Sequence, residues 1–62
     1  MNKPKIKLIG QDGNIFNLLG IAINALENAG QNKQAEELTD KVMNSSSYRE
    51  ALKIIGEYCT VS

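Results

Sequence analysis

Apolar side chains surround most of one predicted helix, which extends over residues 14–29. Its polar or small residues recur at steps of three and four, which places them on one face of a helix. This stripe consists of Asn17, Gly20, Asn24, Glu27 and Asn28. The rest of the helix surface is apolar and includes Ile15, Phe16, Leu18, Leu19, Ile21, Ala22, Ile23, Ala25 and Leu26. Because such a helix must be covered on more than one side, we expect the other elements to pack around it.

Residues 5–9 alternate between charged and aliphatic side chains, which is the pattern of a half-buried strand. The lysines would face water, while Ile6 and Leu8 would face the core. A glycine-containing turn then leads into the long helix. Either Asp12 or Asn14 can cap that helix by accepting a hydrogen bond from a free backbone amide at its start.

A second helix is predicted over residues 33–43. Gly30 stands where a left-handed residue ends the first helix, and Asn32 can cap the second one. The apolar residues of the second helix form one narrow stripe among charged side chains, which consists of Ala35, Leu38 and Val42. The sequence therefore predicts a covering helix with a hydrated outer face.

A third helix is predicted over residues 48–57. Ser47 and Glu50 have the spacing of a capping box at its start. The side chains expected in the core are Tyr48, Ala51, Leu52 and Ile55. The β-branched residues near the C-terminus favour a short strand over 59–62, with a fraying end as the alternative.

These elements predict one α+β domain over residues 1–62, with three helices and short N- and C-terminal strands. A two-stranded ribbon alone is marginally stable in water, and two copies joined along an edge would protect it. Gly20 lies in mid-helix, where glycine costs up to about 1 kcal/mol, and it could admit the backbone near Gly56 or that of a second copy. We therefore expect a homodimer. The interface residues predicted for it are Ile6, Leu8, Gly20 and Val61.

Charge and composition favour no nucleic-acid or membrane partner. Seven basic and seven acidic residues cancel, so no net field attracts the chain to an anionic surface. No apolar run approaches the roughly 20 residues of a membrane span, and the N-terminus lacks the features of a signal peptide. A single cysteine, Cys59, suits a reducing compartment. We expect a cytoplasmic protein.

The sequence offers little chemistry for catalysis. It contains no histidine, so Cys59 has no such base to deprotonate it and is expected to be a small buried apolar residue. One thiol is also far from the four ligands of a structural zinc site. Glu36, Glu37 and Asp40 lie among lysines on the second helix and are expected to form a hydrated surface. We expect no enzyme activity, metal or cofactor.

Three binding surfaces can be considered. The neutral amides of the long helix suit a protein contact, because charged residues are depleted at interface centres. This candidate partner surface consists of Asn14, Asn17, Asn24 and Asn28, and a solvent-facing helix edge is the alternative. The turn before the helix could bind a small anion at the helix N-terminus. Nucleic-acid binding would use phosphate contacts from Lys3, Lys5 and Lys7, and is less favoured because no basic face is predicted.

A resemblance to a known group rests on several short motifs. They are Asp12-Gly13-Asn14-Ile15-Phe16, Leu18-Leu19-Gly20, Ala25-Leu26 and Ala29-Gly30, followed by a tyrosine-centred helix and a β-like tail. This pattern resembles a group of small bacteriophage and mobile-element proteins. The resemblance implies a phage-borne accessory protein that binds a protein of the bacterial host, in the manner of inhibitors of antiviral defence. A small nucleic-acid-binding regulator and a sequestering protein for a small anionic ligand are the alternatives.

Overall fold

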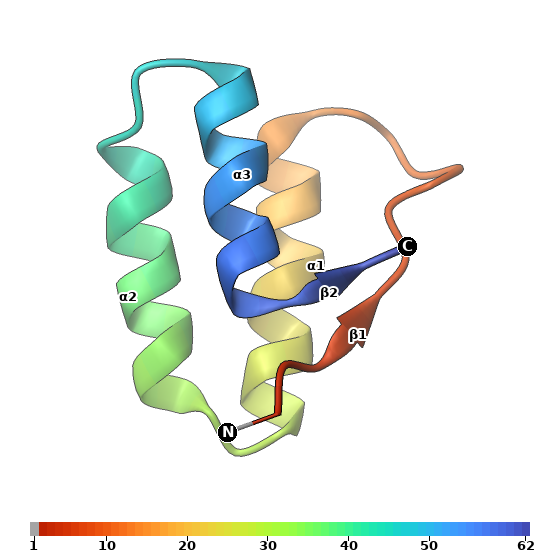
Figure 1. Cartoon of the computed structure of the whole chain (residues 1–62), viewed down its shortest axis with the longest axis vertical. Helices are drawn as coiled ribbons and strands as arrows, with labels where there is room; N and C mark the ends of the chain where they lie inside the picture. Colours follow the sequence, from red (N-terminus) through yellow and green to blue (C-terminus); the bar gives the residue numbers. More distant parts are fainter. Residues whose placement is uncertain (1) are drawn as a thin grey trace.

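The computed structural model describes residues 2–62, which form three helices and two short strands. The helices are α1 (Ile15–Asn28), α2 (Asn32–Met43) and α3 (Tyr48–Tyr58). The strands are β1 (Lys5–Ile6) and β2 (Thr60–Val61). Figure 1 shows the helices side by side, with the strand pair at the opposite edge of the bundle from α2. The predicted α+β class and the predicted order of elements are confirmed.

The two strands bring the ends of the chain together. They pair in parallel, with Lys5 opposite Thr60 and Ile6 opposite Val61. The amide of Ser62 donates to the carbonyl of Ile6 at 3.0 Å, and the two strands are shorter than the predicted 5–9 and 59–62. Beyond Leu8 the chain turns away, since Gly10 adopts a left-handed conformation with φ of 85°.

The core lies between the three helices and β1. Its fully or nearly buried side chains are Ile6, Leu18, Leu19, Ala22, Leu26, Ala35, Leu38, Val42, Ala51, Ile55 and Cys59. Contacts with α2, α3 and β1 cover α1 within the single chain, and of its large apolar side chains only Phe16 is exposed. The apolar surface of α1 is therefore covered by other parts of the same chain, without a second copy.

Local capping follows the sequence at the start of α1 and of α3. The Asn14 side chain accepts a hydrogen bond from the amide of Phe16 at 2.8 Å, which settles the choice between Asp12 and Asn14. The Ser47 hydroxyl accepts from the amide of Glu50 at 3.1 Å, as expected for a capping box. In a complete capping box the Glu50 carboxylate would also accept from the amide of Ser47. Here it accepts from the hydroxyl of Ser46 instead.

The start of α2 differs from the prediction. Gly30 has a φ of 76°, as predicted for the end of α1. Asn32, however, is the first residue of α2, and Gln31 occupies the cap position without a side-chain capping bond. The Gln31 side chain instead donates to the carbonyl of Asn2 at 2.9 Å. The expectation that Asn32 caps α2 is therefore wrong, because the tight turn after Gly30 starts the helix one residue earlier.

Across the described part of the chain, residues 2–62, no helix combines the length and the apolar character that a membrane span requires.

Candidate functional site

The exposed large apolar side chains border two hollows in the surface. Among residues 2–62, five large hydrophobic residues are exposed, namely Ile9, Phe16, Met43, Tyr48 and Val61. All five line one or the other of two hollows in the surface, and Tyr48 lines both. Scattered single exposures are normal on a protein surface, whereas a continuous apolar patch marks a contact site. The two hollows are therefore the candidate functional site.

The larger hollow, the Ile9 hollow, has a volume of about 530 Å³. Its walls come from the loop after β1, the start of α1, one face of α3 and the C-terminal residues. The lining residues are Leu8, Ile9, Gly13, Leu18, Tyr48, Leu52, Gly56, Val61 and Ser62. Of the large hydrophobic residues that line this hollow, Ile9 is the most exposed, at 74%. The hollow is thus an apolar depression bordered by an exposed aliphatic side chain.

The smaller hollow, the Phe16 hollow, has a volume of about 310 Å³. It lies where the start of α1, the end of α2 and the start of α3 meet. The lining residues are Ile15, Phe16, Val42, Met43, Ser45, Ser46, Ser47, Tyr48 and Ala51. Phe16 and Met43 are 63% and 62% exposed, so an aromatic ring and a flexible thioether chain border a serine-rich wall.

Tyr48 connects the two hollows and holds the loop that forms one wall. Its hydroxyl donates to the carbonyl of Gly13 at 2.6 Å, which ties α3 to the segment before α1. The side chain is 48% exposed, so the prediction that Tyr48 belongs to the core is wrong. The polar phenol has its bonding partner at the surface, and this keeps the ring at the boundary between protein and water.

The loop before α1 is built by short-range hydrogen bonds. The Asp12 carboxylate accepts from the amide of Asn14 at 3.1 Å, and the Asn17 side chain donates to the carbonyl of Asp12 at 3.0 Å. A carboxylate therefore already interacts with the backbone that leads into α1. It would repel an anion at the helix N-terminus, so this geometry does not favour the predicted anion site.

The predicted amide surface divides into two parts. Asn14 and Asn17 build the loop and the start of α1, as described above. Asn24 and Asn28 lie exposed on α1, and neither side chain lines either hollow. Asn24 and Asn28 follow Phe16 by eight and twelve residues, which places them two and three turns further along α1 and rotated by roughly 80° and 120° from it.

The residues predicted for a dimer interface do not lie on one common surface. Leu8 and Val61 both line the Ile9 hollow. Ile6 is only 5% exposed and packs in the core, so it offers no surface to a second copy. At Gly20 and at Gly56 an added Cβ would meet nothing within 4 Å, so the proposed close approach of these two glycines is wrong.

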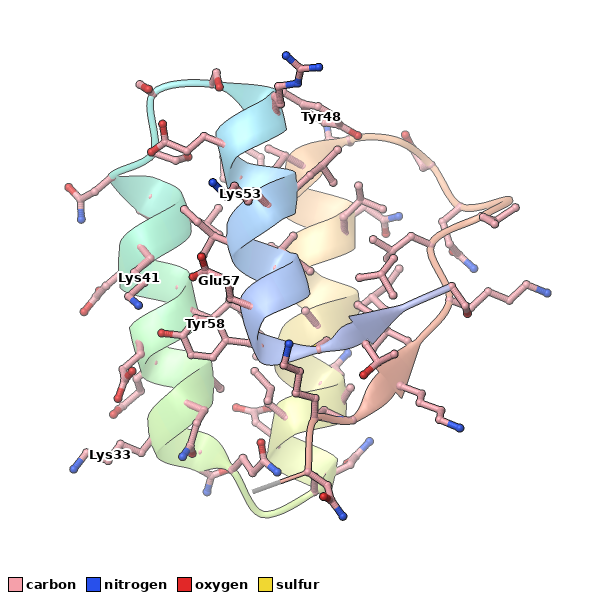
Figure 2. All side chains as sticks on the ribbon, viewed as in Figure 1. Lys33, Lys41, Tyr48, Lys53, Glu57 and Tyr58 are labelled. Atoms are coloured by element: carbon pink, nitrogen blue, oxygen red, sulfur yellow. The ribbon has the colours of Figure 1, made fainter. Side chains whose placement is uncertain are left out.

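The opposite end of α3 has a different environment. The Tyr58 hydroxyl donates to the Glu37 carboxylate at 3.1 Å, and the Lys41 ammonium lies 5.2 Å from the centre of the Tyr58 ring. Figure 2 shows the Tyr58 side chain extending from α3 towards α2, which carries Lys41, with Tyr48 at the other end of α3. The hydrogen-bonding interaction with Tyr58 is the main factor that raises the pKa of Lys41.

Cys59 is buried, whereas the acidic residues of α2 are exposed. Cys59 is completely buried, and burial raises the pKa of its thiol, although the nearby Lys3 ammonium lowers it to a smaller extent. Its sulfur lies 3.9 Å from the carbonyl oxygen of Ala22, within reach of a weak hydrogen bond. Glu36 and Asp40 are exposed on α2, and among the residues that the structure describes no acidic, histidine or cysteine cluster is suited to a metal ion.

The N-terminal lysines do not act as one group. The Lys3 ammonium donates to the carbonyl of Gly56 at 3.1 Å, and this hydrogen bond connects the N-terminal segment to the end of α3. Lys5 and Lys7 are exposed on either side of the buried Ile6.

Comparison of the chain with protein-family models, with curated proteins and with solved structures finds no match.

Proposed function

We propose that this chain is a non-catalytic protein-binding module, and that the Phe16 hollow contacts its partner. The observation that supports this proposal is the position of the large apolar side chains that are exposed within residues 2–62, each of which borders one of two hollows. Aromatic residues and methionine are enriched at protein interfaces, and Phe16, Met43 and Tyr48 supply these types at one hollow.

The partner that we propose is a protein of a bacterial host. The resemblance to small phage and mobile-element proteins supports this choice, with inhibition of antiviral defence as the corresponding role. Action would take place in the bacterial cytoplasm, where the thiol of Cys59 would stay reduced. Asn24 and Asn28 lie exposed further along α1 and would be reached by a partner that extends along this helix.

Co-purification with matched variants tests this function. Tagged wild-type protein, the double variant Phe16→Asn/Met43→Asn and the control Ile9→Asn would each be exposed to bacterial lysate. All three substitutions replace exposed side chains, so the fold should persist, and circular dichroism checks this. We expect one host protein to be retained by the wild type and the control but lost with the double variant. Equal retention by all three proteins, or retention by none, would contradict the proposal.

A further inference from the structure

The outer edge of β1 carries backbone groups that the strand pair does not use. Pro4, Ile6 and Leu8 make the backbone hydrogen bonds to the C-terminal segment. Because backbone groups alternate sides along a strand, the amides and carbonyls of Lys5 and Lys7 point away from β2. The other strand, β2, contacts α3, and β1 lies on the outer side of the pair (Figure 1). Within the described residues 2–62, neither lysine has a backbone partner on this side.

We propose that this edge of β1 binds an extended segment of another protein, with acidic residues at alternate positions. The segment would lie beside β1 as a third strand, and its backbone would donate to and accept from Lys5 and Lys7. Neither lysine lines the Ile9 hollow or the Phe16 hollow. The inference therefore does not rest on the partner proposed for the Phe16 hollow.

The charge of the edge decides which side chains fit beside it. Lys5 and Lys7 are exposed and two residues apart, so both lie on the face of β1 opposite to the buried Ile6. Residues 2–11 contain three lysines and no acidic residue. No hydrogen bond or ion pair within residues 2–62 engages the ammonium groups of Lys5 and Lys7. Opposite charges at facing positions of neighbouring strands attract, so the added strand needs two carboxylates separated by one residue.

A second copy of the chain does not fit this edge. Two-fold pairing of β1 with the same strand of another copy would bring the outward lysines of one copy opposite those of the other, and like charges at facing positions are destabilising. Lysines on an edge strand oppose the pairing of identical chains in this way. The same lysines attract a strand of opposite charge, which points to an acidic segment of a different protein.

Nucleic acid is the other polyanion that two lysines could attract. Phosphate oxygens only accept hydrogen bonds, whereas the edge presents the carbonyl acceptors of Lys5 and Lys7 beside their amide donors. A peptide backbone offers donors and acceptors in matching alternation. Two lysines are also much less than the basic face of a nucleic-acid-binding domain. The edge therefore favours an extended protein segment.

A synthetic peptide tests this inference on the full chain. The probe is a fluorescent peptide with capped ends and a central Glu-Val-Glu, and its control carries Gln-Val-Gln instead. We expect fluorescence anisotropy at low salt to show binding of the glutamate peptide and about tenfold weaker binding of the glutamine peptide. The variant Lys5→Gln/Lys7→Gln should weaken binding of the glutamate peptide about tenfold.

A matched variant controls for the loss of charge. Lys33→Gln/Lys53→Gln removes two exposed lysines from α2 and α3, away from β1 (Figure 2). It has the same net charge as the variant at the edge and should leave the affinity for the glutamate peptide within about twofold of the wild type. Circular dichroism checks the fold of both variants.

Backbone hydrogen exchange separates strand addition from a purely ionic contact. The glutamate peptide should slow exchange at the amides of Lys5 and Lys7, which become hydrogen-bonded, and should change the amide of Ile6 little because it faces β2. Unchanged exchange at both lysine amides would overturn the inference.

Three binding results would also overturn it. They are no binding of the glutamate peptide up to about 1 mM, equal binding of the glutamine peptide, and equal losses in the two double variants. Single-stranded DNA that binds more tightly than the peptide would assign the edge to nucleic acid instead. Co-purification tests the Phe16 hollow with other residues, so either proposal can fail while the other stands.

Discussion

The two ends of α3 carry one tyrosine each, and their surroundings differ. Tyr58 donates to the carboxylate of Glu37 and has the Lys41 ammonium near its ring, so charged side chains complete this end. Tyr48 donates to a backbone carbonyl, and apolar side chains border its ring on both sides. The same residue type is thus surrounded by charged groups at one end and by apolar side chains at the other. The neighbouring side chains, rather than the tyrosine itself, distinguish the proposed binding surface from the opposite end.

The largest expected effect comes from a substitution in the closed core, which we compare with a substitution at the open hollow. Leu19 is 5% exposed, and Leu19→Ala should lower the free energy of unfolding by about 2–5 kcal/mol because it leaves a cavity. Leu52 is half-buried and lines the Ile9 hollow, so Leu52→Ala should cost only about 1 kcal/mol, because the space is already open to water. Denaturant melts of both variants measure the difference. Equal losses would show that the hollow is filled in solution.

The buried thiol next to Tyr58 should make stability depend on pH. Burial raises the pKa of Cys59, so above about pH 8.5 the unfolded chain loses this proton before the folded chain does. The free energy of unfolding then falls as pH rises, by at most about 1.4 kcal/mol per pH unit for this group. Urea melts from pH 7.5 to 9.5 should show a steeper fall for the wild type than for Cys59→Ala. Parallel pH profiles would mean that the thiol is accessible to water.

Removal of each tyrosine hydroxyl tests the comparison directly. Tyr48→Phe deletes the bond to the Gly13 carbonyl and should cost about 0.5–1.5 kcal/mol. It should also speed hydrogen exchange at the amide of Gln11 in the adjoining loop, which donates to the carbonyl of Leu8. Tyr58→Phe should leave that exchange rate unchanged. If both variants exchange alike, the hydroxyl of Tyr48 does not hold the loop.

The smallest effect concerns Gly20, for which a dimer contact is the prediction from sequence. An added Cβ meets nothing within 4 Å in the protomer, so Gly20→Ala should raise stability by roughly 0.5–1 kcal/mol through helix propensity. The mass in sedimentation should stay that of the wild type. A loss of stability or of dimer would instead place the backbone of a second copy against α1.

The helices could be predicted from sequence because local signals agreed at their ends. The bounds of α1, α2 and α3 differ from the predicted ones by at most one residue. The periodic spacing of apolar residues, the Ser47 cap and the left-handed Gly30 act within a few residues, so one sequence is enough to find them. The cap of α2 was missed because the geometry of the preceding turn, and not the residue type, decides it.

The candidate site was harder to predict because its residues come from separate elements. One signal was nevertheless present. Ile9 falls on the same side of the period-two pattern as the exposed Lys5 and Lys7, so it is an apolar residue at a position expected to face water. Phe16 gives no such signal, because the pattern places it on the apolar surface of the helix. Their neighbourhood with Met43 and Tyr48 depends on the packing of the helices, which the sequence pattern alone does not give.

The most direct test of the central claim compares co-purification from bacterial lysate by two variants, one at each end of α3. Phe16→Asn/Met43→Asn changes the apolar end, and Lys41→Asn changes the exposed charged end. We expect the host protein that the wild type retains to be lost with the first variant and kept with the second. Loss with Lys41→Asn, or equal retention by both variants, would contradict the account.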